Sequence, residues 1–172
     1  HLRFPKVKLA LHAGELTRQL VEEEHLKFHI NLAVREAKAL RIGHGVDLLE
    51  ETSYEEILDL MRLNNTAVEI LLDSNKFILN VGTNQHPFLK YWEAELPIVL
   101  ATDDPALLRI RLSDQYLAAA RAFNTLKYSD FKQLAFNSIK YSFLAEHEIL
   151  DLLNKLNAAF IEFEDRILTE KH

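Results

Sequence analysis

The chain has 172 residues, of which 48% are hydrophobic, and its formal net charge is −6. This size and apolar content suit a single domain with a buried core. The negative charge argues against nucleic acid or an anionic membrane surface as the main partner, because both attract clustered Lys and Arg. The sequence contains no cysteine, which excludes disulfides, thiolate metal sites and a cysteine nucleophile. Small molecules or other proteins are therefore the expected partners.

The chain begins with His1, and its only methionine is Met61. We therefore expect residues before His1, either removed or belonging to a longer protein. No apolar run reaches the roughly 20 residues that span a bilayer, and residues 1–5 lack the apolar core of a signal peptide. No membrane anchor is expected in this stretch. Any targeting segment would lie upstream, which leaves a cytoplasmic and a secreted location both open.

Four short apolar runs each end in polar residues, and they predict four strands. The expected strands are residues 6–11, 41–43, 67–72 and 97–102. Consecutive apolar residues, as in the first run, are typical of strands that are buried on both faces of a parallel sheet. A helix is expected after each strand, in units of about 30 residues, which predicts right-handed crossovers between parallel strands.

Local signals place the first helices. The charged segment 17–29 is expected to be irregular or weakly helical, and Asn31 is the expected N-cap of the next helix. Ser53 and Glu56 have the spacing of a capping box at the start of a second helix, which Asn64 and Asn65 would end.

The second half of the chain is expected to be mainly helical. Residues 77–79 are assigned to a connection, and a helix of about ten residues is expected around 88–96. Further helices are expected at 113–123, 130–141 and 146–168. Apolar residues recur at helical spacing in the last of these helices, and we expect them to pack: Ile149, Leu152, Leu153, Leu156, Phe160, Phe163 and Ile167.

The polar strand exits are expected to meet at the carboxyl edge of the sheet, where α/β proteins keep their sites. Three of the four exits have structural explanations. His12 could be a buried histidine bonded to a carbonyl, with Glu15 only beginning the next segment, and His44 could lie in a turn. Asp103 and Asp104 before Pro105 could form an N-cap. Together, such nitrogen and oxygen ligands could hold a divalent metal and leave an acid and a base free. This combination indicates hydrolase chemistry.

Four motifs, in order and spacing, resemble successive motifs of the adenosine deaminase family: His12-Ala13-Gly14-Glu15, Arg41-Ile42-Gly43-His44-Gly45, Ser74-Asn75 and Thr102-Asp103-Asp104-Pro105. The resemblance runs from about residue 8 to residue 144, and residues 137–144 are similar to a stretch of the adenosine-deaminase-related growth factor branch. It implies an α/β fold, a (β/α)8 barrel of the TIM-barrel type with zinc at its carboxyl face. This chain would then be a single-domain fragment, residues 1–172, covering about the last four β/α units and the C-terminal helices.

The resemblance also implies roles around the metal. His12 and Asp103 would be zinc ligands, and Asp103 would also accept a hydrogen bond from the metal-bound water. His44 would orient that water and take up its proton. Zinc lowers the pKa of its water from about 15.7 toward 7, which provides hydroxide at neutral pH.

Three further residues would contact the substrate by the same resemblance. Glu15 would give a proton to the purine ring nitrogen beside the carbon under attack, for which Glu15 must itself be protonated. Gly14 would offer its backbone amide to the far ring nitrogen, and Asp104 would bond to the imidazole-ring nitrogen.

The implied function is zinc-dependent hydrolytic deamination of adenosine or 2'-deoxyadenosine to inosine and ammonia. The family's other two zinc ligands come from a His-x-His pair on the first strand, which this sequence lacks. Leu71 and Leu72 stand where relatives carry Cys-Pro, which changes the pocket wall. A barrel needs at least about 200 residues, so activity is expected to require an N-terminal half that this chain does not contain.

Two alternatives remain at this point. The chain could belong to a non-catalytic binding or signalling domain derived from the barrel, with an incomplete metal site. The protein could also use the same metal and hydrolysis on another substrate, either another aminopurine or a nucleotide. The zinc deaminases with a His/Cys/Cys site are excluded because the chain has no cysteine. In either case the open strand edges of half a barrel predict aggregation or pairing with another chain.

Overall fold

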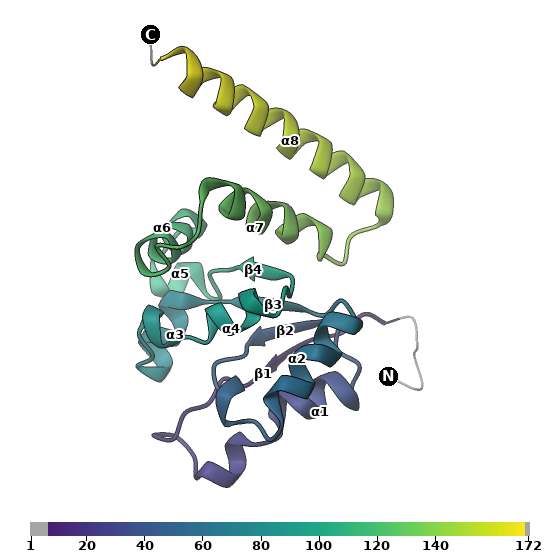
Figure 1. Ribbon diagram of the computed structural model, residues 1–172, viewed down its shortest axis with the longest axis vertical. Coiled ribbons are helices and arrows are strands. Elements are labelled where there is room, and N and C mark those ends of the chain that lie inside the picture. Colours follow the sequence, from purple (N-terminus) through teal and green to yellow (C-terminus); the bar gives the residue numbers. More distant parts are fainter. Residues whose placement is uncertain (1–6, 171–172) are drawn as a thin grey trace.

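The computed structural model describes residues 7–170, which form a parallel sheet with helices packed on it (Figure 1). Neighbouring strands pair in the order β1-β2-β3-β4. The predicted (β/α) organisation is confirmed, although the expected start of the first strand at residue 6 lies outside the described residues. The strands are β1 (Ala10–Ala13), β2 (Arg41–His44), β3 (Ala67–Ile70) and β4 (Ile98–Leu100).

Helices connect the strands and continue beyond the last one. In Figure 1, α7 and the long α8 lie at the end of the molecule opposite to α1, and α8 is farthest from the sheet. None of the helices in residues 7–170 is long and apolar enough to cross a membrane. The α-helices are α1 (His29–Arg35), α2 (Tyr54–Leu63), α3 (Leu72–Leu79), α4 (Phe88–Glu93), α5 (Pro105–Leu108), α6 (Leu112–Ala122), α7 (Tyr128–Lys140) and α8 (Glu146–Thr169). Three short 3-10 helices are η1 (Glu23–Leu26), η2 (Leu48–Glu50) and η3 (Thr83–Gln85).

The core lies between one face of the sheet and the helices. Because side chains alternate along a strand, every second residue points into this core. Its strand members are Ile42, Val68, Ile70, Ile98 and Leu100, and the helices add Ile30, Ile57, Met61, Phe88 and Tyr91. This packing fixes the strand ends and therefore the positions of the loops that follow them.

The second face of the sheet is polar and only partly covered. Ala10 and His12 are exposed on β1, so the prediction that the first strand is buried on both faces is wrong for the described residues. On the same face Arg41 forms an ion pair with Glu69, and its guanidinium lies 4.6 Å from the centre of the Phe143 ring. This is the face that points toward the axis in a closed barrel.

The predicted N-cap at Asn31 is wrong, because α1 begins at His29, three residues before the start that this cap predicts. The capping acceptor is Glu51, which lies beyond β2 and whose side chain is buried. Its Oε1 accepts hydrogen bonds from the amides of Ile30 and Asn31, the latter at 3.3 Å. A carboxylate at a helix N-terminus satisfies free amides and interacts favourably with the helix dipole. Glu51 thereby ties α1 to the loop after β2.

The predicted capping box at Ser53 is also wrong. The helix α2 begins at Tyr54 as expected, but Ser53 has a left-handed backbone (φ 57°) and its side chain makes no capping hydrogen bond. An N-cap residue normally has an extended backbone that directs its oxygen at the N2 or N3 amide. The expected end of this helix is confirmed, with Asn64 at its C-cap.

Two helices differ from expectation. Residues 77–79 belong to α3 rather than to a connection; Phe77 and Ile78 are exposed on it, which obscured an amphipathic pattern. The prediction that the apolar residues of α8 pack is only partly met, because α8 has no buried residue and contacts mainly α7. Leu152, Phe163 and Ile167 each remain more than a third exposed.

Candidate active site at the carboxyl edge of the sheet

The loop after β1 makes a tight turn at Gly14. Its φ is +71°, and a Cβ atom there would lie 2.4 Å from Oδ1 of Asp47. The Gly14 carbonyl accepts hydrogen bonds from the amides of Val46 (2.8 Å) and Asp47 (3.1 Å) in the loop after β2. Glycine is required here because the left-handed backbone and the close carboxyl group leave no room for a side chain. The turn brings Glu15 back toward the strand end.

Glu15 lies between two histidines. Its Oε2 is 3.3 Å from Nδ1 of His12 and 3.3 Å from Nε2 of His44. The two imidazole rings meet edge to face, with their centres 4.6 Å apart. Among the described residues, these three side chains form a group whose potential ligand atoms lie within 4.8 Å of one another. The pairing of β1 with β2 produces this arrangement, because it sets His12 beside Gly43, next to His44.

His44 is fully buried, and Nδ1 of its ring contacts Asn75. Nδ1 lies 2.8 Å from Oδ1 of Asn75, so the ring carries its proton on Nδ1 and donates it to the amide oxygen. The other nitrogen, Nε2, has no hydrogen-bond partner, because Glu15 is near enough but lies outside hydrogen-bonding geometry. A neutral imidazole held in this way presents a free lone pair to the site and can accept a proton.

Asp103 joins the site through Ser74. The Ser74 hydroxyl, which is buried, donates a 2.7 Å hydrogen bond to Oδ2 of Asp103. Asp103 itself has a left-handed backbone (φ 64°) directly after β4. Asp103 does not belong to the close group of His12, Glu15 and His44, so its role as a metal ligand stays a prediction.

Asp104 occupies the N-cap position of α5, and Pro105 is the first helical residue. The Asp104 side chain makes no capping hydrogen bond. Asp104 therefore occupies the predicted N-cap position, but its carboxylate does not cap the helix. The carboxylate is consequently not engaged in capping and can serve another contact.

A series of polar contacts, joined through the adjacent residues Ser74 and Asn75, thus crosses the exits of all four strands. Ser74 and Asn75, at the start of α3, supply its middle: one bonds to Asp103 beyond β4 and the other to His44 at the end of β2. The Ser74-Asn75 pair is one of the motifs that carry the family resemblance, but the sequence predicts neither of these contacts. Gln115 of α6 fixes the same turn, because its Nε2 donates a 2.6 Å hydrogen bond to Oδ2 of Asp73.

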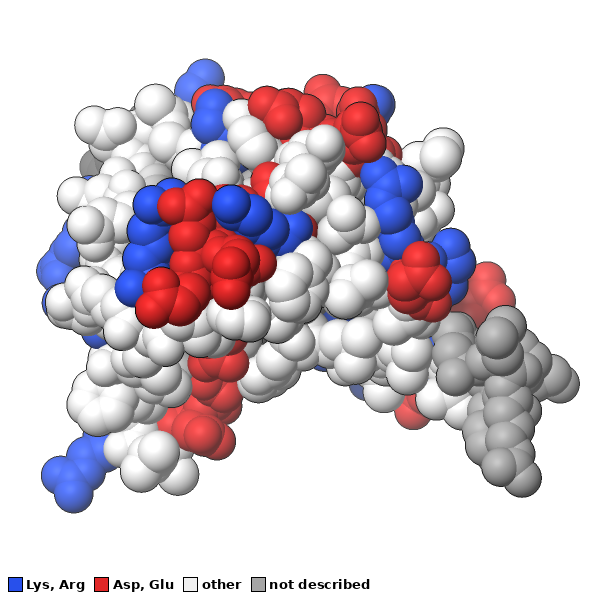
Figure 2. All heavy atoms as spheres, turned by 90° about the horizontal axis from the view of Figure 1, so that it is seen from below, with Lys and Arg blue, Asp and Glu red and all other residues white. Residues whose placement is uncertain are grey.

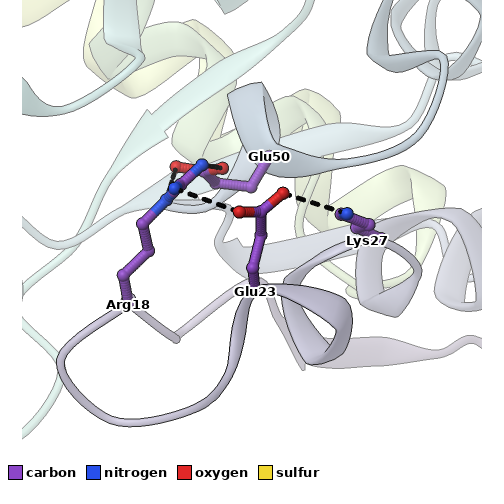
Figure 3. A network of polar contacts seen from close by, with 4 residues as sticks. All are labelled: Arg18, Glu23, Lys27 and Glu50. Atoms are coloured by element: carbon purple, nitrogen blue, oxygen red, sulfur yellow. Dashed lines mark hydrogen bonds and ion pairs between the residues drawn. The ribbon is translucent and has the colours of Figure 1, made fainter.

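Ion pairs fasten the segment that follows Glu15 (Figure 3). Arg18 donates two hydrogen bonds to Glu50 of η2, at 2.6 and 3.0 Å, and a third to Glu23 at 3.2 Å. Lys27 pairs with the other oxygen of Glu23 at 3.0 Å. Figure 2 shows that acidic and basic groups are interspersed on the underside of the molecule. The network links the loop after β1, which contains Glu15, to the loop after β2, which follows His44.

Cavities add little to the description of the site. One cavity of about 570 Å³ is lined by Trp92, Pro97 and Tyr141 among others, and lies at the amino end of the strands, away from the histidines. A smaller pocket of about 250 Å³ lies beside the site between the loops after β1 and β2 and the end of α3. The carboxyl edge itself is open, because the sheet of residues 7–170 does not close on itself.

Asp47, which packs against Gly14, is a buried acid whose two oxygens have no hydrogen-bond partner. Burial, with a smaller contribution from the charge of Glu51, raises the pKa of Asp47 from 3.8 to about 7. The folded protein therefore holds a proton that the unfolded chain releases between pH 4 and 7. The free energy of unfolding should therefore fall as pH rises through this window, by roughly 1.4 kcal/mol at most for each unit of pKa difference. Above about pH 7 it should level off.

We expect Asp47→Asn to flatten the dependence of unfolding free energy on pH between 4 and 7. Urea unfolding at several pH values measures this slope. Asp59→Asn is the matched control, because Asp59 is exposed on α2 with a side chain 74% accessible. An unchanged slope in Asp47→Asn would show that this carboxyl does not carry the buried proton.

Comparison with known proteins identifies the family. The family model described as adenosine deaminase matches residues 3–159. The adenosine deaminase of Plasmodium gallinaceum is 30% identical over 158 residues, covering 91% of this chain and 41% of the relative. The N6-methyl-AMP deaminase of Bos taurus is 32% identical over 151 residues, covering 87% and 40%. The chain thus spans about two fifths of the length of these curated relatives.

Solved structures agree with the fold. The Arabidopsis ADAL protein complexed with IMP superposes with a TM-score of 0.74 at 24% identity, covering 93% of this chain and 43% of that one. An amidohydrolase from Burkholderia ambifaria with bound Zn gives a TM-score of 0.75 at 18% identity, covering 97% and 44%. Since the family match covers most of the chain and carries the motifs that meet at the carboxyl edge, the chain belongs to the adenosine deaminase family.

Proposed function

We propose that this chain is the carboxyl-terminal half of a zinc-dependent aminohydrolase that converts adenosine or 2'-deoxyadenosine to inosine and ammonia. An N-terminal half would complete the barrel along the open edges of β1 and β4. The observation that carries the proposal is the series of polar contacts from His12 to Asp103 across the four strand exits. Relatives named adenosine deaminase support the reaction.

The donor set of the site fits a zinc ion. Imidazole and carboxylate are ligands that zinc accepts, and the buried Nε2 of His44 without a hydrogen-bond partner marks a place prepared for polar groups. His12 and Asp103 would be this chain's ligands, and the N-terminal half would provide the others. When bound, the metal supplies an activated water at neutral pH.

This chain's own residues would do the remaining chemistry. The Nε2 lone pair of His44 would accept a proton from the attacking water, while Asn75 holds the opposite ring nitrogen. Glu15 would deliver a proton to the purine ring nitrogen and make the neighbouring carbon electrophilic. The backbone amide of Gly14 and the carboxylate of Asp104 would orient the purine through its other nitrogens.

The test uses the protein with both halves present. Zinc content is measured by atomic absorption, and turnover is followed by the ultraviolet change from adenosine to inosine, with 2'-deoxyadenosine and N6-methyl-AMP as parallel substrates. We expect about one zinc per chain and the fastest turnover with adenosine or 2'-deoxyadenosine. Preference for N6-methyl-AMP would overturn the substrate, and a protein that binds no zinc and deaminates none of the three would be the non-catalytic binding domain instead.

A further inference from the structure

Two buried side chains form hydrogen bonds with backbone carbonyls where β2 ends and the next loop begins. Nε2 of His86 lies 3.2 Å from the carbonyl oxygen of His44, and the hydroxyl of Tyr91 donates a 2.7 Å hydrogen bond to the carbonyl of the next residue, Gly45. His86 is 5% exposed and Tyr91 is fully buried. Both come from the stretch at the end of η3 and in α4, more than 40 residues after the loop they contact.

The backbone at this point is unusual. His44 has a φ of +74° and Gly45 a φ of +59°. A left-handed conformation is unfavourable for a residue with a Cβ atom, and it persists only where the surroundings hold it. Once the chain leaves the extended conformation, its carbonyls no longer meet a neighbouring strand. The side chains of His86 and Tyr91 satisfy them instead.

Gly45 and Tyr91 are fitted to each other. A Cβ atom at residue 45 would lie 2.3 Å from the Tyr91 hydroxyl oxygen. The absence of a side chain at Gly45 therefore allows the hydroxyl to reach the carbonyl. The amide of Gly45 in turn donates a 3.0 Å hydrogen bond to the carbonyl of Ala13, which joins the loop to the end of β1.

The side chains of His86 and Tyr91 both carry a proton that they can donate at neutral pH. Burial lowers the pKa of His86 to about 4, so its ring is neutral and carries one N–H. A carbonyl only accepts hydrogen bonds, so that proton is on Nε2. Burial also raises the pKa of Tyr91 well above its usual value, which keeps the hydroxyl protonated.

We propose that His86 and Tyr91 are positioning residues for His44: they hold the left-handed backbone that directs the imidazole toward Glu15 and His12. Asn75 sets the rotation of the ring, and His86 and Tyr91 set the main chain from which the ring projects. The inference rests on the proposed function, because it assigns both residues to the site in which His44 accepts a proton.

The kinetic test compares three variants in the complete, zinc-loaded protein. Tyr91→Phe removes only the hydroxyl, His86→Leu removes the donor, and His86→Gln keeps an N–H donor. We expect the first two to lower kcat by about 10–100-fold, as loss of outer-shell partners does, with KM changed less than about threefold. His86→Gln should recover most of the loss. Tyr116→Phe is the matched control, since Tyr116 packs on Phe131 in the outer helices.

A double-mutant cycle separates positioning from general damage. In a His44→Ala background, Tyr91→Phe and His86→Leu should change the residual kcat by less than about twofold, because their effect passes through the missing imidazole. Losses that multiply with that of His44→Ala would overturn the proposal.

A spectroscopic readout decides the inference even if the protein deaminates nothing. The ring nitrogens of His44, observed by NMR in protein labelled with ¹⁵N-histidine, should report one tautomer protonated on Nδ1. Tyr91→Phe and His86→Leu should give mixed tautomers, while Tyr116→Phe should retain the single form. Unchanged His44 ring signals in both variants would overturn the proposal, whatever the outcome of the adenosine assay.

Discussion

Replacing Glu15 by glutamine is expected to lower kcat for adenosine by about 10²–10⁴-fold, the range for loss of a general acid. Glutamine has nearly the same shape, so it should preserve the packing of the Gly14 turn, but its amide cannot supply the proton that activates the purine ring. KM should change little, because the substrate's other contacts remain. Steady-state kinetics with adenosine measure both parameters.

Zinc content distinguishes two explanations for that loss. The Glu15 carboxylate is 3.3 Å from both His12 and His44, near enough to belong to a set of metal ligands. If Glu15 acts as the acid, Glu15→Gln should retain the zinc of the parent protein while losing turnover. Loss of zinc in parallel with turnover would assign Glu15 to the metal instead.

The matched control is Glu24→Gln, at a side chain that is 79% exposed in η1. It makes the same replacement of a carboxyl by an amide in the same connection without altering the site, so kcat should stay within about twofold of the parent. If Glu15→Gln also retained kcat within that range, the proposed acid would be ruled out.

The sheet could be predicted because each strand carries its own signal. Runs such as residues 67–72 are mainly apolar and short, and each is followed by polar residues and a helical pattern. A helix between successive strands predicts that the strands run parallel, and parallel strands place all exits at one edge. His12, Glu15 and His44 meet at this edge because β1 and β2 are parallel neighbours in the sheet, as predicted.

The helix caps could not be predicted in the same way. A capping residue chosen from local spacing competes with any carboxylate that the fold brings near. Glu51 reaches the first turn of α1 from 20 residues away, and it displaces Asn31 from that role. Likewise Ser53 fails as a cap because the tight turn after η2 forces it into a left-handed backbone.

The supports of His44 are the least predictable part of the site. Asn75, His86 and Tyr91 contact it or its neighbour from 31 to 46 residues farther along the chain. Nothing in the local sequence near them marks these contacts, since a buried histidine or tyrosine fits any core. Of these residues, only Asn75 lies at a predicted strand exit. That placement predicts that Asn75 lies at the carboxyl edge of the sheet, but it does not predict that Asn75 contacts His44.

The most informative substitution beside Glu15 is Asn75→Ala, which is expected to lower kcat by about 10–100-fold. The amide oxygen of Asn75 holds the proton of His44 on Nδ1, which leaves Nε2 free to act as a base. Without that acceptor the ring can also carry its proton on Nε2, the wrong nitrogen for taking one from water. Steady-state kinetics with adenosine measure the loss.

Two companion variants identify the cause. Asn75→Asp keeps an oxygen at the same place, so it should recover most of the activity that alanine removes, because a carboxylate also accepts the Nδ1 proton. Asn154→Ala, on the outer helix α8, removes an amide that faces solvent and should leave kcat unchanged. If Asn75→Asp were as impaired as Asn75→Ala while both unfolded at the parent's temperature, the amide would act by some route other than the tautomer of His44. Recovery by aspartate alone would identify the acceptor oxygen as the feature that makes His44 a base.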